Sequence, residues 1–285
     1  MTILQILILA AVQGAAELLP VSSSAHVIVA AKLMGLDPTT PEMTMLLVML
    51  HTGTMFAVIL FFWKGWKESF FSSSKRFKKF CGRIFIATLL TGVVGLGVKG
   101  VIERVAFGKG ARAEIEMLFG NLGLISLSLA VVGVLIICAG LKRVRFPKQE
   151  VGMAEACGIG AVQGLCLPLR GFSRSGATIS TGLLMGMAKE RLEEFSFALA
   201  VVLTPPVIAR EVLRLMKAHA VSVAAGGPLL HLFVPSLCGM VLSFVSGLLA
   251  LRWLSSWLEK GRWHYFGYYC LAASAIVFTL YRMGM

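Results

Sequence analysis

Two short stretches of an otherwise apolar chain concentrate side chains that could handle a charged ligand. Residues 13–26 read QGAAELLPVSSSAH, and residues 163–181 read QGLCLPLRGFSRSGATIST. The first stretch supplies a carboxylate, three hydroxyls and an imidazole, and the second supplies two arginines and further hydroxyls. Carboxylates and imidazoles can transfer protons. The planar guanidinium group of arginine donates hydrogen bonds in a geometry that matches phosphate oxygens. Together the two stretches predict a site for an anion, most simply a phosphate group.

The first stretch predicts a broken helix with a polar group at the break. Gln13 and Glu17 stand four residues apart, so they share one helix face. Pro20 ends or kinks that helix, and a serine after it can cap the next helix, with His26 in its first turn. The serines that we expect near the ligand are Ser22, Ser23 and Ser24. One serine in an apolar helix is usually a packing residue, but a glutamate at membrane depth is a functional candidate by default.

The second stretch supplies the opposite charge. Glycines beside Arg174 let backbone N–H groups approach an anion, and a helix beginning near residues 175–178 would direct its positive end there. The residues that could contact the anion are Arg170, Ser173, Arg174, Ser175, Gly176 and Thr178. A purely structural alternative is that Arg174 neutralises Glu17 or extends toward the membrane surface.

The composition predicts an all-α protein embedded in a membrane. Of 285 residues, 57% are hydrophobic and 14% are charged, whereas soluble domains are about a quarter charged. The mean hydropathy is +0.84. The net charge of +13 is typical of a membrane protein whose cytoplasmic loops are rich in lysine and arginine. Binding to nucleic acid explains it less well, because the sequence has no basic stripe interleaved with aromatic residues.

The order of apolar segments predicts an inverted repeat. About six segments have the length of a membrane span: 44–63, 84–102, 118–141, 195–216, 229–251 and 265–282. Two further regions, about 1–36 and 153–188, are apolar but broken, and each precedes three spans. We therefore expect two broken re-entrant helical pairs within one membrane domain: repeat one about 1–141, a cytoplasmic linker about 142–152, and repeat two about 153–285. Paired interrupted segments in corresponding places indicate a binding site near the midplane.

Charged loops predict the orientation. Loop 64–83 carries seven basic residues and one acidic residue, and loop 142–150 carries four and one, so both are expected on the cytoplasmic side. Loop 103–117 carries three of each and is expected outside, together with loop 37–43.

The two motifs resemble a known family. Gln13-xxx-Glu17-Leu-Leu-Pro-Val-Ser-Ser-Ser-Ala-His26, with Gly171-Phe-Ser-Arg-Ser-Gly-Ala-Thr178, is similar to undecaprenyl-diphosphatase, the integral-membrane enzyme associated with bacitracin resistance. The similarity extends along the whole chain. It implies an inverted repeat of six spans and two re-entrant pairs, in agreement with the segments above.

The resemblance also implies an activity. It implies hydrolysis of undecaprenyl diphosphate to undecaprenyl phosphate and inorganic phosphate, which recycles the carrier lipid for peptidoglycan synthesis and confers resistance to bacitracin, a compound that sequesters the substrate. It implies a divalent cation, Mg²⁺ or Ca²⁺, and a site that opens to the outer side of the bacterial plasma membrane. The family's motif residues fall on Glu17, Ser23, His26 and Arg174, which are the expected catalytic residues.

Several points depart from the family pattern or stay open. Ala25 replaces a usual glycine, and two residues separate Pro168 from Gly171 where the family has none, which adds Arg170 beside the site. Gln13 stands where the family has Glu or Gln, so metal binding by Glu17 and Gln13 relies on fewer anionic groups. Either His26 or Ser23 could be the nucleophile, since a serine could use a histidine three residues later as its base.

Two rival functions can be compared with the sequence. Acid-phosphatase-like lipid phosphatases pair a histidine with a downstream aspartate, but this chain has one aspartate, Asp37, and no suitable spacing. A flippase for undecaprenyl phosphate, alone or as a second activity, would need Arg174 but no nucleophile. His51, inside an apolar span, could line the site or bond to a neighbouring helix, and the sequence does not choose between them.

Overall fold

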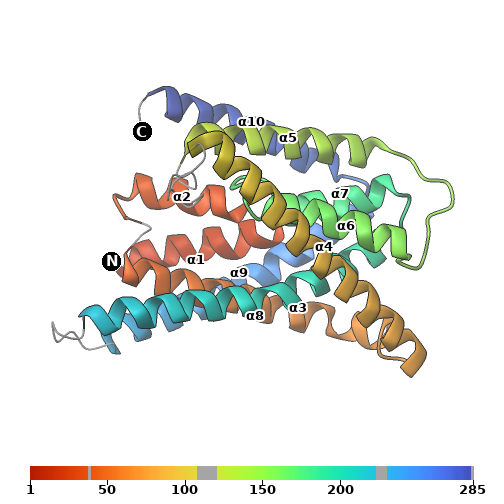
Figure 1. Ribbon diagram of the computed structural model, residues 1–285, viewed down its shortest axis with the longest axis horizontal. Helices are drawn as coiled ribbons and strands as arrows, with labels where there is room; N and C mark the ends of the chain where they lie inside the picture. The colour runs from red at the N-terminus through yellow and green to blue at the C-terminus, as the bar shows by residue number, and fades with distance from the viewer. Residues whose placement is uncertain (38–39, 108–120, 223–229, 284–285) are drawn as a thin grey trace. The chain divides into compact units, whose positions relative to one another are not determined.

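The computed structural model describes residues 1–37, 40–107, 121–222 and 230–283. Their secondary structure is helical apart from one isolated β-bridge between Lys148 and Met187, which confirms the all-α expectation. The helices, labelled in Figure 1, are α1 Ile3–Leu18, α2 Ser23–Leu33, α3 Pro41–Ser69, α4 Ser74–Phe107, α5 Leu122–Leu141, α6 Met153–Cys166, α7 Arg174–Leu184, α8 Lys189–Ser222, α9 Leu230–Glu259 and α10 His264–Arg282.

Four helices of the described chain are long and apolar enough to cross a membrane. They cover Met43–Ser69, Ser74–Val105, Leu122–Leu141 and Val234–Glu259. The other two expected spans, 195–216 and 265–282, lie in α8 and α10, which are helical but are not among these four. The protein is thus a multi-pass membrane protein, and the count of six spans stays a prediction. The expected outer loops 37–43 and 103–117 lie partly outside the described residues.

Both broken regions are observed as pairs of short helices. α1 and α2 have 16 and 11 residues, and α6 and α7 have 14 and 11. A span needs about 20 residues, so none of the four is long enough to cross alone. The first break lies at Leu19–Ser22, around Pro20 as predicted. The second break ends where α7 begins at Arg174, one residue before the predicted range.

The chain forms two compact units. The first contains Met1–Leu19, Ser23–Trp63 and Ala200–Leu254, and the second contains Pro20–Ser22, Lys64–Leu199 and Ser255–Met285. Each unit therefore draws on both halves of the sequence. The division into sequence repeats 1–141 and 153–285 stays a prediction.

Glycines let the short helices pack closely on long ones within each unit. In the first unit, a Cβ on Gly14 of α1 would lie 2.7 Å from the Ser243 carbonyl oxygen of α9. In the second, a Cβ on Gly164 of α6 would lie 2.9 Å from the Thr91 carbonyl oxygen of α4. Gly14 and Gly164 are the corresponding glycines of the two Val-Gln-Gly sequences. Such matched contacts are what an internal repeat predicts.

Hydrogen bonds add to the packing in the second unit. Thr91 donates to the Gly160 carbonyl at 3.0 Å and accepts from the Gln163 amide at 3.1 Å. α5 and α10 pack along each other, as Figure 1 shows, and Ser126 and Ser274 each donate to the other's carbonyl oxygen at 3.0 and 2.7 Å. These contacts fix the helices on which α7 rests.

Replacing Gly160 with Ala should destabilise the protein. The added methyl group would collide with the carbonyl oxygen of Ala87 and lie 2.6 Å from its Cα, and backbone atoms cannot move aside cheaply. Overpacking of this kind costs about 1–3 kcal/mol. Thermal unfolding in detergent should show a lower melting temperature for Gly160→Ala. Gly97→Ala in α4 is the control, because nothing lies within 4 Å of its added methyl group. Equal losses in both variants would contradict the packing account.

Candidate functional site

The first break is a strained turn between α1 and α2. Ser22 has a φ of 68°, and it is the one non-glycine residue of the described chain in the left-handed region. Left-handed backbone is uncommon for a residue with a side chain and is often found at functional sites. The next residue, Ser23, begins α2, so its side chain lies at the positive end of that helix.

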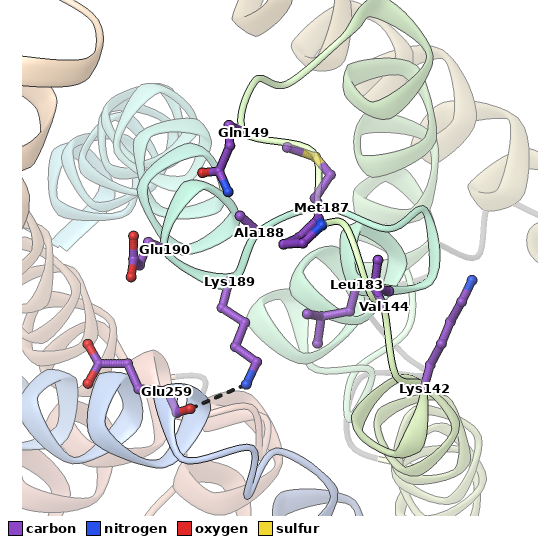
Figure 2. Close-up of a pocket in the computed structure, with 10 residues that line it drawn as sticks. Lys142, Val144, Gln149, Leu183, Met187, Ala188, Lys189, Glu190 and Glu259 are labelled. Atoms are coloured by element: carbon purple, nitrogen blue, oxygen red, sulfur yellow. Dashed lines mark hydrogen bonds between the residues drawn. The ribbon is translucent and has the colours of Figure 1, made fainter.

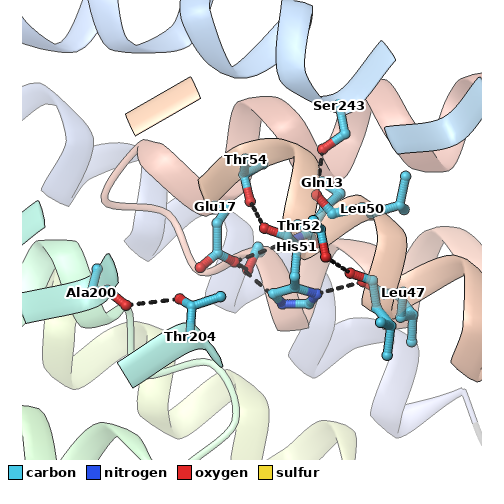
Figure 3. Close-up of polar contacts among 12 residues, drawn as sticks. Gln13, Glu17, Leu47, Leu50, His51, Thr52, Thr54, Ala200, Thr204 and Ser243 are labelled. Atoms are coloured by element: carbon cyan, nitrogen blue, oxygen red, sulfur yellow. Dashed lines mark hydrogen bonds and ion pairs between the residues drawn. The ribbon is translucent and has the colours of Figure 1, made fainter. Parts of the chain in front are cut away.

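Glu17 is the centre of a polar cluster in the first unit. Its Oε2 atom accepts a hydrogen bond from the Ser23 hydroxyl at 2.5 Å and another from the Gln13 amide nitrogen at 3.1 Å. The Glu17 side chain is 16% exposed, so it is reachable but held largely away from solvent. The structure thus brings together the three residues that the sequence placed around the first break. Figure 3 shows Gln13 and Glu17 in this cluster.

His51 joins the same cluster from α3. Its Nε2 atom lies 3.7 Å from Glu17 Oε2, and its Nδ1 atom lies 2.8 Å from the Leu47 carbonyl oxygen (Figure 3). The sequence left His51 open between lining the site and bonding to a neighbouring helix, and the structure places it against Glu17. The available signal was an ionisable residue within an apolar span, which is rare and usually functional.

The remaining residues of the first motif lie in and before the first turn of α2. Ser22 is buried, Ser24 and His26 are half-buried, and Ala25 is buried at 2% exposure. The buried methyl group of Ala25 shows that this turn accommodates an alanine where the family usually has glycine. Ser22 belongs to the second compact unit, whereas Ser23, Ser24 and His26 belong to the first.

The second break is built around a glycine that no other residue could replace easily. Gly171 has a φ of 93°, and a Cβ there would lie 2.6 Å from the Ile125 carbonyl oxygen of α5. Both the backbone conformation and the close approach therefore require glycine. Arg170 immediately precedes this turn and is half-buried, as is Arg174, the first residue of α7.

The hydroxyls around Arg174 shape the beginning of α7. Ser173 is the N-cap residue, and its Oγ accepts a hydrogen bond from the Gly176 amide at 3.2 Å. Thr178 Oγ1 donates to the Arg174 carbonyl at 2.8 Å and shares a 2.6 Å hydrogen bond with Ser196 of α8. Ser173, Ser175 and Thr178 are buried. In this structure Thr178 connects α7 to α8, a contact that the sequence did not suggest, and its contact with a ligand stays a prediction.

The two motif groups belong to different compact units. The first unit contains the first group, which consists of Gln13, Glu17, Ser23 and His51. The second unit contains the second group, which consists of Ser173, Arg174, Ser175, Gly176 and Thr178. The first group offers proton acceptors and metal-binding atoms. The second offers a guanidinium at a helix N-terminus, where backbone N–H groups and the helix dipole favour an anion.

The first group could supply part of the coordination of a cation, with a bound ligand supplying the rest. It does not form a metal site made of protein atoms alone. No set of three or more His, Cys, Asp or Glu side chains in the described chain is placed to hold a metal. Gln13 turns its amide nitrogen toward Glu17, so here it orients the carboxylate, and its own metal binding stays a prediction. Mg²⁺ is commonly held by one or two carboxylates plus substrate phosphates, which suits a single Glu17.

A separate cavity lies in the second unit and contains none of the motif residues. It has a volume of about 340 Å³, and its lining includes Lys142, Gln149, Lys189, Glu190 and Glu259 (Figure 2). Lys189 donates to the Glu259 carbonyl oxygen at 3.3 Å. The cavity is bordered by the expected cytoplasmic linker, where Lys148 pairs with Glu155 at 2.6 Å and holds the pKa of that carboxyl below its ordinary value. Lysines and glutamates together do not define one class of ligand, so the motif groups are the better candidates for the functional site.

Comparison with known proteins agrees with the motifs. The model of the family described as bacitracin resistance protein BacA matches residues 6–276. The chain is 56% identical over 281 residues to undecaprenyl-diphosphatase 2 of Acinetobacter baylyi, with 98% of each chain covered. It is 31% identical to undecaprenyl-diphosphatase of Bacteroides fragilis, with 96% of each covered, and 33% identical to that of Moorella thermoacetica, with 97% of each covered. Matches of this extent show common ancestry along the whole chain, which therefore belongs to the BacA family of bacitracin resistance proteins.

Proposed function

We propose that this protein hydrolyses undecaprenyl diphosphate to undecaprenyl phosphate and inorganic phosphate. The observation that carries the proposal is the Glu17 cluster, in which a serine hydroxyl, an amide and an imidazole surround one carboxylate oxygen in an apolar chain. Relatives that cover nearly the whole chain bear the name undecaprenyl-diphosphatase. The substrate's polyprenyl tail suits a protein whose helices are embedded in a bilayer.

The two motif groups divide the work of phosphoryl transfer, which consists chiefly of positioning and charge stabilisation. Arg174 and the N-terminus of α7 bind the diphosphate oxygens. Glu17 accepts the Ser23 proton or orients the attacking group, and Gln13 holds Glu17 in place through its amide. His26 or Ser23 supplies the nucleophile. The 2.5 Å bond from Ser23 to Glu17 would let the carboxylate serve as the base for that serine.

We propose that a divalent cation, Mg²⁺ or Ca²⁺, binds at Glu17 during turnover. When bound, it would neutralise charge on the phosphate oxygens. Glu17 is the carboxylate of the cluster, and the substrate's own oxygens would complete the coordination. Ser22, Ser24, Ser175 and Arg170 are the remaining candidates for contacts with the diphosphate.

The family and the charges of the loops support a proposal for the location. We propose that the protein lies in the bacterial plasma membrane with the site opening to the outer side, and that bacitracin opposes it by sequestering the substrate. Recycling the carrier lipid would support peptidoglycan synthesis. The relatives above are named as phosphatases, so the flippase alternative has no support from them.

Chelation tests the requirement for a cation. Purified protein should release phosphate from undecaprenyl diphosphate in detergent, and EDTA should abolish most of that release. Adding back Mg²⁺ or Ca²⁺ should restore it. Phosphate release that is unaffected by EDTA would contradict the requirement for a cation but would leave the proposed phosphatase activity in place. No release from folded protein with the cation present would contradict the proposed reaction itself.

A further inference from the structure

We propose that His51 is a metal ligand that acts beside Glu17, so that the cation is held by one carboxylate oxygen and one imidazole nitrogen. The proposal rests on the proposed function, since it concerns the cation expected at Glu17. It adds a residue outside the two motifs and a specific donor atom, Nε2 of His51.

The hydrogen bond of His51 Nδ1 leaves Nε2 as the ring nitrogen that can bind a metal. His51 Nδ1 lies 2.8 Å from the Leu47 carbonyl oxygen, and a carbonyl oxygen only accepts hydrogen bonds. Nδ1 therefore carries the proton, and in the neutral ring Nε2 presents its lone pair. Histidine ligands almost always donate their other ring N–H to a carbonyl or carboxylate, which fixes the tautomer and the ring orientation. The Leu47 contact is of that kind.

The two donor atoms are separated by a distance that one metal ion can bridge. His51 Nε2 and Glu17 Oε2 lie 3.7 Å apart, which is longer than a hydrogen bond. Bonds from oxygen or nitrogen ligands to divalent metals are about 2.0–2.6 Å long, so one ion can reach both atoms. The His51 side chain is 40% exposed, so an incoming ion can reach Nε2.

The helix around His51 is held in place by its neighbours. Ser243 of α9 donates to the Leu50 carbonyl oxygen at 2.7 Å, and the Thr54 hydroxyl donates to the His51 carbonyl oxygen at 2.9 Å (Figure 3). Gly53 lies against the backbone of Met240, with no room for a methyl group. A ligand that is fixed by surrounding contacts keeps its donor atom in place, which a metal site needs.

A mixed donor set has a consequence for the choice of metal. Carboxylate oxygens suit Mg²⁺, Ca²⁺ and Mn²⁺, whereas imidazole nitrogen suits transition metals. The pair of Glu17 and His51 should therefore bind Mn²⁺ more tightly than Ca²⁺. Mn²⁺ is also paramagnetic, so it reports the identity of its ligands directly.

The test is pulsed electron paramagnetic resonance of the purified full-length protein with Mn²⁺ and no substrate. We expect a nitrogen coupling typical of imidazole, which disappears in His51→Ala together with a loss of Mn²⁺ affinity of about tenfold or more. His26→Gln should keep the coupling, which assigns the signal to His51. Thr52→Val is the matched control on α3, because the Thr52 hydroxyl donates to the Val48 carbonyl at 2.8 Å and not to Glu17.

The possible results distinguish failure of the His51 proposal from failure of the proposed phosphatase activity. Bound Mn²⁺ that is lost in Glu17→Gln but shows no nitrogen coupling in wild-type protein would overturn the role of His51 and leave the phosphatase intact. A coupling that disappears in His26→Gln and persists in His51→Ala would also overturn it. Where His51→Ala does not fold, the wild-type and His26→Gln spectra decide, because an absent coupling in wild-type protein or its loss in His26→Gln overturns the role of His51. Absence of phosphate release from protein with the coupling would instead contradict the reaction.

Discussion

Glu17→Gln is expected to lower phosphate release from undecaprenyl diphosphate by at least about 100-fold, the size of effect seen when one preorganised polar group of an active site is removed. Glutamine keeps the size of the side chain but removes the negative charge that would hold the cation and accept the Ser23 proton. The three groups around Glu17 Oε2 would then face a neutral amide. Initial rates at saturating substrate, with and without added cation, measure the effect.

The control for Glu17→Gln is Glu150→Gln in the linker. The Glu150 side chain is 72% exposed and makes one long contact with Arg83 at 3.7 Å. Exposed pairs contribute little, so Glu150→Gln should keep nearly the full rate. A Glu17→Gln protein that is folded and retains more than a tenth of the wild-type rate would contradict the role of the carboxylate.

Arg174→Ala should lower the same rate by about 1,000-fold, the lower end of the range for arginines that stabilise phosphoryl transfer. Arg174 begins α7, so its loss removes the guanidinium while the Ser173 cap and the helix N-terminus remain. Arg174→Lys should recover part of the rate, because it restores the charge without the planar fork. Arg83→Ala, on α4 beyond the motif groups, is the matched control.

A flippase would respond differently to these substitutions. Loss of Arg174 would impair binding of the phosphate in either case, but loss of Glu17 would leave transport of undecaprenyl phosphate largely unchanged. If Arg174→Ala keeps the wild-type rate of phosphate release, the assignment of the second motif fails. If the two substitutions together cost no more than the larger one alone, the two groups act as a unit on one substrate.

Much of the local structure could be predicted from the sequence. Pro20 and the serines after it define the break between α1 and α2, and the Gly171–Gly176 segment defines the beginning of α7. The pairing of Gln13 with Glu17 follows from helical spacing and is observed as a hydrogen bond. These features depend on residues near one another in the chain, where propensity and capping decide the outcome.

Contacts between distant residues could not be predicted in the same way. His51 meets Glu17 across 34 positions because Gly14, Gly53 and Ser243 set how α1, α3 and α9 pack. The hydrogen bond between Thr178 and Ser196 likewise depends on how α7 packs against α8. Periodicity identifies an apolar face but does not say which helix covers it. The sequence therefore made Glu17 a candidate functional residue but could not choose between two roles for His51.

The fate of the lipid itself shows whether the protein is a phosphatase or a transporter. Wild-type protein in liposomes should convert undecaprenyl diphosphate to undecaprenyl phosphate, with one inorganic phosphate released for each lipid converted, as quantified by mass spectrometry and a phosphate assay. Glu17→Gln and Arg174→Ala liposomes should retain the diphosphate. Folded wild-type protein that leaves the diphosphate intact, while moving undecaprenyl phosphate between leaflets, would contradict the phosphatase activity and identify a transporter.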